Sequence, residues 1–357
     1  MSHSLSMINS ILAKASDGKE LCRTEIKMLM NAKDEAAISK TLETARLIRK
    51  EHFGNKIFIY GFVYLSNFCK NDCVFCYHKR SNKYCKRYRL SPSEIIEYSK
   101  TLESMGVHLV DLTMGEDPKI LSENCHFLIQ LVKKVRSETD LRIMASPGVV
   151  DTKVLRMLEE AGADWYALYQ ETYNRRLFSI LRPKQDFDRR RCAKIIARDQ
   201  DLLVEDGILV GVGENNDDRI ESLLSMKKLG AEQVRAMSFV PQAGTRMEFQ
   251  SSPPLLDELK MIAMLRIICQ DRLIPASLDI DGVKGLQLRL MAGANVITSI
   301  IPDDSSLAGV ADPKHLFRPR EVKYLKQYLD GIGLQISSKY EYEDCINDFK
   351  TRRFRNK

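Results

Sequence analysis

Eight short apolar runs recur along most of this chain, separated by segments with the spacing of amphipathic helices. Runs of this length, rich in Val and Ile, are typical of strands buried on both faces in a parallel sheet. Eight such β/α units predict a closed (β/α)8 barrel, and an open, doubly wound parallel sheet is the alternative. The expected strands are Ile57–Ser66, His108–Met114, Arg142–Ser146, Trp165–Gln170, Ile208–Val212, Val234–Val240, Ile274–Ile280 and Val296–Ile301.

Capping and stop signals mark helices between these strands. The clearest is a capping box formed by Ser91 and Glu94, with Pro92 at the first helical position. The segment Val204–Gly207 is expected to be a turn that leads from a helix into the fifth strand. Further N-caps and helix ends are expected at Asp151, Gly162, Gly230 and Asp257.

Helical patterns outside the strands divide the chain into three expected parts. Residues 1–53 form an N-terminal helical extension packed on the barrel, residues 54–304 form the barrel itself, and residues 305–357 form a C-terminal helical extension. The apolar stripe of the last part contains Val322, Leu325, Leu329 and Ile332.

The charge pattern excludes several classes of partner. The formal net charge is +7, but Lys and Arg are interleaved with Asp and Glu, so no nucleic-acid partner is expected. The denser basic stretches, Lys79–Arg89 and Lys350–Lys357, are interpreted as solvated surface. No apolar run reaches the ~18 residues of a membrane span, and the N-terminus lacks an apolar signal core. We therefore expect a cytoplasmic protein with no membrane partner.

Three of the nine cysteines form a CxxxCxxC arrangement directly after the first expected strand. Cys69, Cys73 and Cys76 therefore lie on the first loop between strand and helix, at the end where barrels carry their active sites. Three thiolates within eight residues can bind three irons of a [4Fe-4S] cluster and leave the fourth iron open. An open iron can bind the amino and carboxylate groups of S-adenosylmethionine (SAM), whose reductive cleavage produces a carbon radical.

Two other interpretations of this loop compete with the cluster. A structural zinc site would take a further ligand from His78 or Cys85. Alternatively, the three cysteines share no role. The remaining cysteines lie mostly on expected helices or at their edges, where free buried thiols are the rule, and they are Cys22, Cys85, Cys125, Cys192, Cys269 and Cys345.

The cysteine motif, with Phe75 before and Tyr77 after its last cysteine, resembles the radical SAM superfamily. The resemblance implies that Phe75 packs against the adenine of SAM and that the Tyr77 backbone hydrogen-bonds the adenine edge. Gly115-Glu116, after the second strand, is similar to the family's GGE motif, whose backbone receives the SAM amino group. Met114 stands in place of the first glycine of that motif.

Three further residues resemble SAM contacts of the biotin synthase-like subgroup. The resemblance implies that Glu171 meets the SAM ammonium or the ribose hydroxyls, and that Arg190 binds the carboxylate. It also implies a ribose contact for Ser146. A surface ion pair is the alternative for Glu171 and Arg190.

Polar residues at inward-facing strand positions predict a charged substrate. Alternation along the seventh strand places Ser277, Asp279 and Asp281 on one face, and the same argument turns Arg235 of the sixth strand inward. Burying such charges unpaired costs several kcal/mol each, so they pair with one another or with a ligand. Together with Asp111 of the second strand, they suit an amino acid with a second ammonium: the arginine binds its carboxylate and each aspartate an ammonium.

Long stretches of the chain are similar to one branch of this subgroup, the methylornithine synthases. The resemblance implies a mutase that uses the 5′-deoxyadenosyl radical to take a hydrogen from lysine, breaks the Cα–Cβ bond and recombines the fragments to (3R)-3-methyl-D-ornithine for pyrrolysine biosynthesis. It also implies an external one-electron donor such as a flavodoxin or ferredoxin. The similar stretches are LTMGEDP (112–118), ALYQETY (167–173), VEDGIL (204–209), RLIPASLDIDG (272–282) and LRLMAGANVITSI (288–300).

Three other functions stay open at this point. A biotin synthase-like enzyme that inserts sulfur would need a second cluster with cysteines on barrel strands, and no spare cysteine falls on an expected strand. A maturase of iron-only hydrogenase belongs to the same subgroup. A non-catalytic iron–sulfur electron carrier would favour a small fold with four cysteines.

Overall fold

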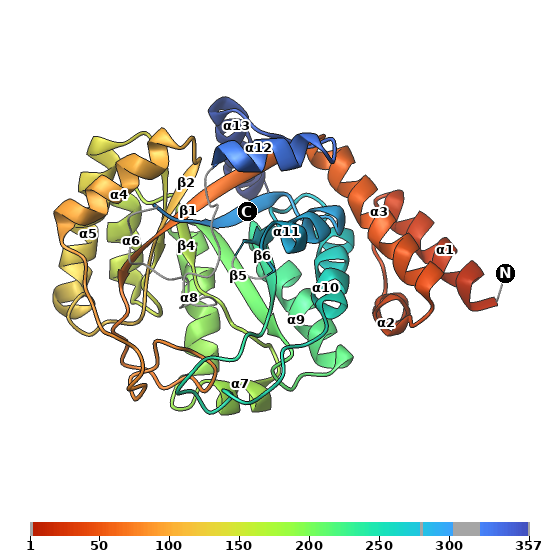
Figure 1. Cartoon of the computed structure of the whole chain (residues 1–357), viewed down its shortest axis with the longest axis horizontal. Coiled ribbons are helices and arrows are strands. Elements are labelled where there is room, and N and C mark those ends of the chain that lie inside the picture. Colours follow the sequence, from red (N-terminus) through yellow and green to blue (C-terminus); the bar gives the residue numbers. More distant parts are fainter. Residues whose placement is uncertain (1–2, 279–280, 303–321, 356–357) are drawn as a thin grey trace.

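Parallel strands surrounded by helices form the core of the protein (Figure 1). The computed structural model describes residues 3–278, 281–302 and 322–355. The barrel strands are β1 (Lys56–Ser66), β2 (Leu109–Met114), β3 (Arg142–Ser146), β4 (Trp165–Ala167), β5 (Leu203–Val210), β6 (Gln233–Ser238), β7 (Pro275–Ser277) and β8 (Val296–Ile300).

The strand order shows a barrel that is almost closed. Hydrogen-bonded neighbours follow the order β6-β5-β4-β3-β2-β1-β8-β7, and every pair between them is parallel. Within the described part of the chain, β6 and β7 meet through a single bridge between Gln233 and Leu273. The Val234 amide donates to the Leu273 carbonyl there, at 2.9 Å. The (β/α)8 prediction is confirmed, and the open sheet is wrong.

Helices cover the barrel and extend it at both chain ends. Helices α1–α3 project from one side in Figure 1, with α3 packed along α10 and α2 against α9. No helix among the described residues is long and apolar enough to cross a membrane. The helices are α1 (His3–Ser16), α2 (Arg23–Asn31), α3 (Glu35–Phe53), α4 (Pro92–Ser104), α5 (Ser122–Glu138), α6 (Thr152–Glu160), α7 (Arg175–Leu181), α8 (Phe187–Asp199), α9 (Asn216–Leu229), α10 (Leu255–Ile268), α11 (Gly282–Met291), α12 (Val322–Asp330) and α13 (Lys339–Arg355).

Most local helix signals act as expected. The Ser91 hydroxyl accepts from the Glu94 amide at 3.3 Å, and Glu94 accepts from the Ser91 amide at 2.7 Å, so the capping box is confirmed. Gly230 ends α9 in the left-handed conformation. Asp151 lies at the N-cap of α6 but makes no cap hydrogen bond, and instead its carboxylate meets Arg189 at 3.1 Å.

Two local predictions are wrong, each because a charged residue has a tertiary partner. Val204–Gly207 is not a turn but part of the first half of β5 (Leu203–Val210), where its two acidic residues are fully buried and paired inside the protein. Asp257 is not an N-cap, because α10 begins after Pro254 and Asp257 lies in its first turn. The carboxylate of Asp257 pairs with Arg219 at 3.1 Å.

The C-terminal segment closes the barrel at the end where the strands begin. The short strand β9 (Gln335–Ile336) pairs with the first residues of β1. The buried His108 imidazole contacts the Ser337 carbonyl at 3.0 Å. Leu325 and Leu329 of the expected apolar stripe are buried. The expected boundary between residues 304 and 305 lies outside the described residues, so the division into three parts stays a prediction.

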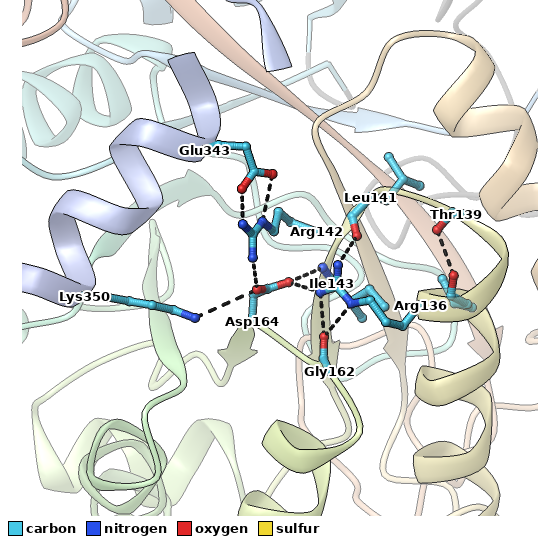
Figure 2. A network of polar contacts seen from close by, with 10 residues as sticks. Arg136, Thr139, Leu141, Arg142, Ile143, Gly162, Asp164, Glu343 and Lys350 are labelled. Atoms are coloured by element: carbon cyan, nitrogen blue, oxygen red, sulfur yellow. Dashed lines mark hydrogen bonds and ion pairs between the residues drawn. The ribbon is translucent and has the colours of Figure 1, made fainter. Parts of the chain in front are cut away.

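A network of ion pairs fastens α13 to this end of the barrel. Figure 2 shows Arg142, at the start of β3, between Glu343 of α13 and Asp164. The buried Asp164 carboxylate accepts from Arg142 at 2.7 Å and from Arg136 at 2.5 Å, and Lys350 lies 4.0 Å away. The network therefore joins α13 to α5, β3 and the residue before β4, which precede it by about 180 residues or more.

Replacing Arg142 by Met should destabilise the protein, because Asp164 and Glu343 would lose the cation between them. We expect the free energy of unfolding to fall by about 2 kcal/mol, the contribution of a hydrogen bond between charged groups that are partly exposed. A denaturant titration of the cluster-free protein measures this change. Arg156→Met, which removes an exposed pair with Glu160 on α6, is the control and should cost less than about 0.5 kcal/mol. Equal effects of the two variants would contradict a supporting role of the network.

Candidate functional site

A cavity of about 300 Å³ opens at the carboxyl ends of the barrel strands. Nearly all residues predicted for the site line it, although they come from segments far apart in sequence. Tyr77 is outside this lining and its hydroxyl donates to the Tyr84 carbonyl at 2.8 Å, whereas Asp279 lies outside the described residues. The predicted residues that line the cavity are Cys69, Cys73, Phe75, Cys76, Asp111, Gly115, Glu116, Ser146, Glu171, Arg190, Arg235 and Ser277.

The cysteine loop is held by its neighbours rather than by regular secondary structure. The Val74 amide donates to the Leu181 carbonyl at the end of α7, at 2.9 Å. Arg87 donates to backbone carbonyls along the loop, including that of His78 at 3.0 Å. These bonds keep all three cysteines at the wall of the cavity without using their sulfur atoms.

The end of β2 lies so close to the cysteine loop that the residue after it, Gly115 of the Gly115-Glu116 motif, has no room for a side chain. A Cβ on Gly115 would lie 2.4 Å from the Phe68 carbonyl oxygen and 2.9 Å from Cβ of Cys69. A side chain at this position would therefore displace the first cysteine. Met114, which replaces the other glycine, is the last residue of β2 and pairs with Ser66 of β1, where the register between the two strands shifts.

The three thiols form a donor set suited to an iron–sulfur cluster. Burial raises the pKa values of Cys69 and Cys76, and the neighbouring cysteines add to the rise. Bound cations are needed to keep such thiols ionised together. In the parts of the chain described here, no three His, Cys, Asp or Glu side chains are close enough to share one metal ion. A cubane binds each thiolate through a different iron, so its three cysteines need not converge on one point.

His78 and Cys85, the expected extra zinc ligands, have other surroundings. Burial, reinforced by the charge of Arg87, lowers the pKa of His78 to about 4, so its ring is neutral. Cys85 accepts a hydrogen bond from the Asn67 side chain at 3.5 Å. The spare cysteines of the chain are all free, and no barrel strand contains one.

Glu171 and Arg190 are buried in the cavity wall, so the surface ion pair considered from sequence is wrong. Glu171 has a left-handed backbone, with φ of 68°. One of its carboxylate oxygens accepts from Arg182 at 2.6 Å, and the other has no partner among the described residues. Arg190 donates to the Tyr169 carbonyl at 2.7 Å and lies 3.5 Å from Glu116.

A fully buried ion pair behind the cavity holds the segment that carries Glu171. The Asp206 carboxylate accepts from Lys194 at 2.7 Å, from the Tyr173 hydroxyl at 2.6 Å and from the Gln170 amide at 3.0 Å. Burial lowers the pKa of Lys194 to about 8, although Asp206 opposes the shift. Sequence reasoning missed this pair and Arg182, because Lys194 and Arg182 lie outside the recognised stretches and meet their carboxylates only when the barrel is packed.

The floor of the cavity contains a second set of buried charges. Arg235 donates to the Tyr169 hydroxyl at 3.0 Å and to Thr298 at 2.8 Å, and it lies 3.7 Å from the Glu205 carboxylate. Its Nε has no hydrogen-bond partner within the described chain. Tyr60 and Tyr169 both donate to Glu205, at 3.1 and 2.9 Å. Part of the Arg235 charge is therefore already compensated by Glu205, which sequence reasoning did not identify.

Asp111 has no cation within hydrogen-bonding distance among the described residues. Its carboxylate accepts from the Ser146 hydroxyl at 2.6 Å, and burial raises its pKa to about 8 against this hydrogen bond. Ser277 contacts Ser299 at 2.9 Å in the same cavity. Asp281, which was expected to face inward, is exposed before α11 and lies 3.5 Å from Arg289, so that prediction is wrong.

The raised pKa of Asp111 predicts that the stability of the folded protein decreases as pH increases. Between about pH 4 and pH 8 the unfolded chain loses this proton while the folded protein keeps it, so the free energy of unfolding should fall as pH rises. The slope from this group is at most about 1.4 kcal/mol per pH unit. Denaturant titrations at pH 5 and pH 8, with Asp111→Asn as reference, measure the change.

Ser146→Ala is the matched variant for this measurement. It removes the hydrogen bond that favours the ionised carboxylate, so the upper end of the pH window should move above pH 8. An identical pH dependence of stability in the unmodified protein and Asp111→Asn would contradict the assignment.

Comparisons with known proteins agree with this geometry. Residues 63–226 match the model of the radical SAM superfamily. A 3-methylornithine synthase of Methanosarcina acetivorans is 43% identical over 93% of this chain and 95% of its own length. A 3-methylornithine synthase of Methanosarcina barkeri is 41% identical over 96% of this chain and 98% of its own length.

A solved structure agrees as well. The crystal structure of methylornithine synthase (PylB) superimposes with a TM-score of 0.89 at 41% identity, covering 94% of this chain and 99% of that chain. The chain therefore belongs to the radical SAM superfamily, whose enzymes use a [4Fe-4S] cluster and SAM, and within it to the 3-methylornithine synthase family.

Proposed function

We propose that this enzyme converts L-lysine to (3R)-3-methyl-D-ornithine for pyrrolysine biosynthesis, with electrons from a flavodoxin or ferredoxin. The observation that carries the proposal is a single cavity with three cysteines in its wall and, within it, a carboxylate without a described cationic partner. The names of the two relatives and of the similar crystal structure support methylornithine as the product.

The residues of the wall divide into two proposed groups. In the first group, Cys69, Cys73 and Cys76 hold the cluster, and when bound, the cluster and SAM supply the radical that removes a hydrogen from the substrate. The same group binds SAM through Phe75, Tyr77, Gly115, Glu116, Ser146, Glu171 and Arg190. The unpartnered oxygen of Glu171 supports this assignment, because a buried carboxylate oxygen gains most from a ligand that donates to it.

The second proposed group binds lysine. Arg235 suits the substrate carboxylate, because its Nε lacks a partner among the described residues. Asp111 suits an ammonium group, since a bound cation would compensate its buried charge. Ser277 and Asp279 complete the proposed set. Two lysine fragments must stay together between cleavage and recombination, and the apolar side chains of Phe62, Leu209 and Phe239 in the same wall help to exclude water.

The proposed cluster ligands can be tested by counting iron. Cys73→Ser should reduce the content of the reconstituted protein from about four irons per chain to a small fraction, because a three-ligand cluster loses one anchor. Cys192→Ser, which changes a free cysteine on α8, should keep the full content. Retention of the cluster by Cys73→Ser would refute this ligand set.

The proposed substrate can be tested with isotopically labelled lysine and mass analysis of the products. Asp111→Asn should keep the cluster and SAM cleavage but lower kcat/KM for lysine by about 30-fold or more, the value of a charged hydrogen bond. Asp140→Asn, at an exposed ion pair with Lys339, should leave turnover unchanged. Full conversion by Asp111→Asn, or no labelled methylornithine from the unmodified enzyme, would contradict the proposal.

A further inference from the structure

Two side chains outside every recognised motif donate hydrogen bonds to the sulfur of Cys73. Arg182 Nη1 lies 3.4 Å from this sulfur, and Gln185 Nε2 lies 3.1 Å from it. Both residues lie in the short connection between α7 and α8, more than a hundred positions after the cysteine. The contact is therefore a product of the fold.

The connection is fixed to the cysteine loop by the backbone. The Arg182 amide donates to the Phe178 carbonyl at 2.8 Å, which continues α7 by one hydrogen bond. The preceding carbonyl, that of Leu181, accepts from the Val74 amide at 2.9 Å. Since Val74 directly follows Cys73, the donors and the sulfur are held by adjoining segments.

Arg182 is oriented by further contacts and is 7% exposed. Its Nη2 donates to Glu171 at 2.6 Å, and its Nη1 also lies 3.4 Å from the side-chain oxygen of Gln185. Its guanidinium carbon lies 5.3 Å from the centre of the Phe75 ring. A buried guanidinium held on these sides cannot turn away from the sulfur without losing an ion pair.

We propose that Arg182 and Gln185 are positioning residues that raise the reduction potential of the cluster through their hydrogen bonds to Cys73. Reduction adds negative charge to the cluster and its thiolates, so a nearby cation and N–H donors stabilise the reduced form more than the oxidised form. Arg182 also connects this sulfur with Glu171, the proposed SAM contact. The inference rests on the proposed ligation by Cys73 and is independent of the identity of the substrate.

The experiment is a redox titration of the reconstituted holoenzyme without lysine, followed by electron paramagnetic resonance. Arg182→Met should move the midpoint potential to more negative values, because both the charge and a donor are lost. Gln185→Leu should move it in the same direction by a smaller amount, since only a neutral donor is lost. Arg182→Lys keeps the charge, so its midpoint potential should lie between that of Arg182→Met and that of the unmodified protein.

The control is Arg175→Met, which removes a surface arginine of α7 that pairs with Asp188 at 2.7 Å. Its midpoint potential should equal that of the unmodified protein. Gln185→Leu leaves the ion pair of Arg182 and Glu171 intact. A shifted midpoint potential in this variant therefore reports the lost hydrogen bond to sulfur and not a Glu171 carboxylate without its cation.

The outcomes separate this inference from the proposed function. The inference is overturned if Gln185→Leu and Arg182→Met keep about four irons per chain and have the same midpoint potential as the unmodified protein. The proposed ligand set stands in that case as long as Cys73→Ser loses its iron. If Arg182→Met loses iron and cannot be titrated, the midpoint potentials of Gln185→Leu and Arg182→Lys test the inference in its place. Retention of iron by Cys73→Ser would instead remove the proposed ligand set.

Discussion

Charged side chains buried inside the barrel must find partners there, and this constraint organises the structure from β4 to β6. Glu205 and Asp206, neighbours on β5, are both fully buried but point to opposite sides of the strand. Glu205 accepts from two tyrosines in the lumen and lies beside Arg235, while Asp206 pairs with Lys194 behind the strand. Because an unpaired charge in either place costs several kcal/mol, the two pairs restrict where β5 can lie.

The pair behind the strand has a direct consequence for the cavity. Asp206 binds the Gln170 amide and the Tyr173 hydroxyl, on either side of the left-handed Glu171. Glu171 in turn orients Arg182, which reaches the sulfur of Cys73. A chain of buried charges therefore extends from the outer face of β5 to the cysteine loop. Such second-layer contacts are known to orient ligands and to tune the metal centres that they surround.

Sequence reasoning recovered the elements that depend on local chemistry. The capping box at Ser91 and the helix end at Gly230 are determined within a few residues, and the structure has them where they were expected. The expected apolar runs overlap the eight barrel strands, although β4 ends at Ala167 instead of Gln170 and β5 begins at Leu203 instead of Ile208. Sequence reasoning failed at Val204–Gly207, because two acidic residues favour a turn unless distant partners neutralise them. Arg182, Gln185 and Glu205 were missed for the same reason, since the residues they contact are far away in the chain.

By itself, the sequence determined the number of barrel strands, the position of the cysteine loop after the first of them and the chemistry that three thiols with that spacing suit. These follow from side-chain periodicity and from ligand geometry over short distances. Only the tertiary structure decided that Glu171 pairs with Arg182 and not with Arg190. It also placed Arg235 beside Glu205, and it left Asp111 without a cation within hydrogen-bonding distance among the described residues. The physical reason is that pairing of buried charges depends on distances across the barrel, which arise when all the strands assemble.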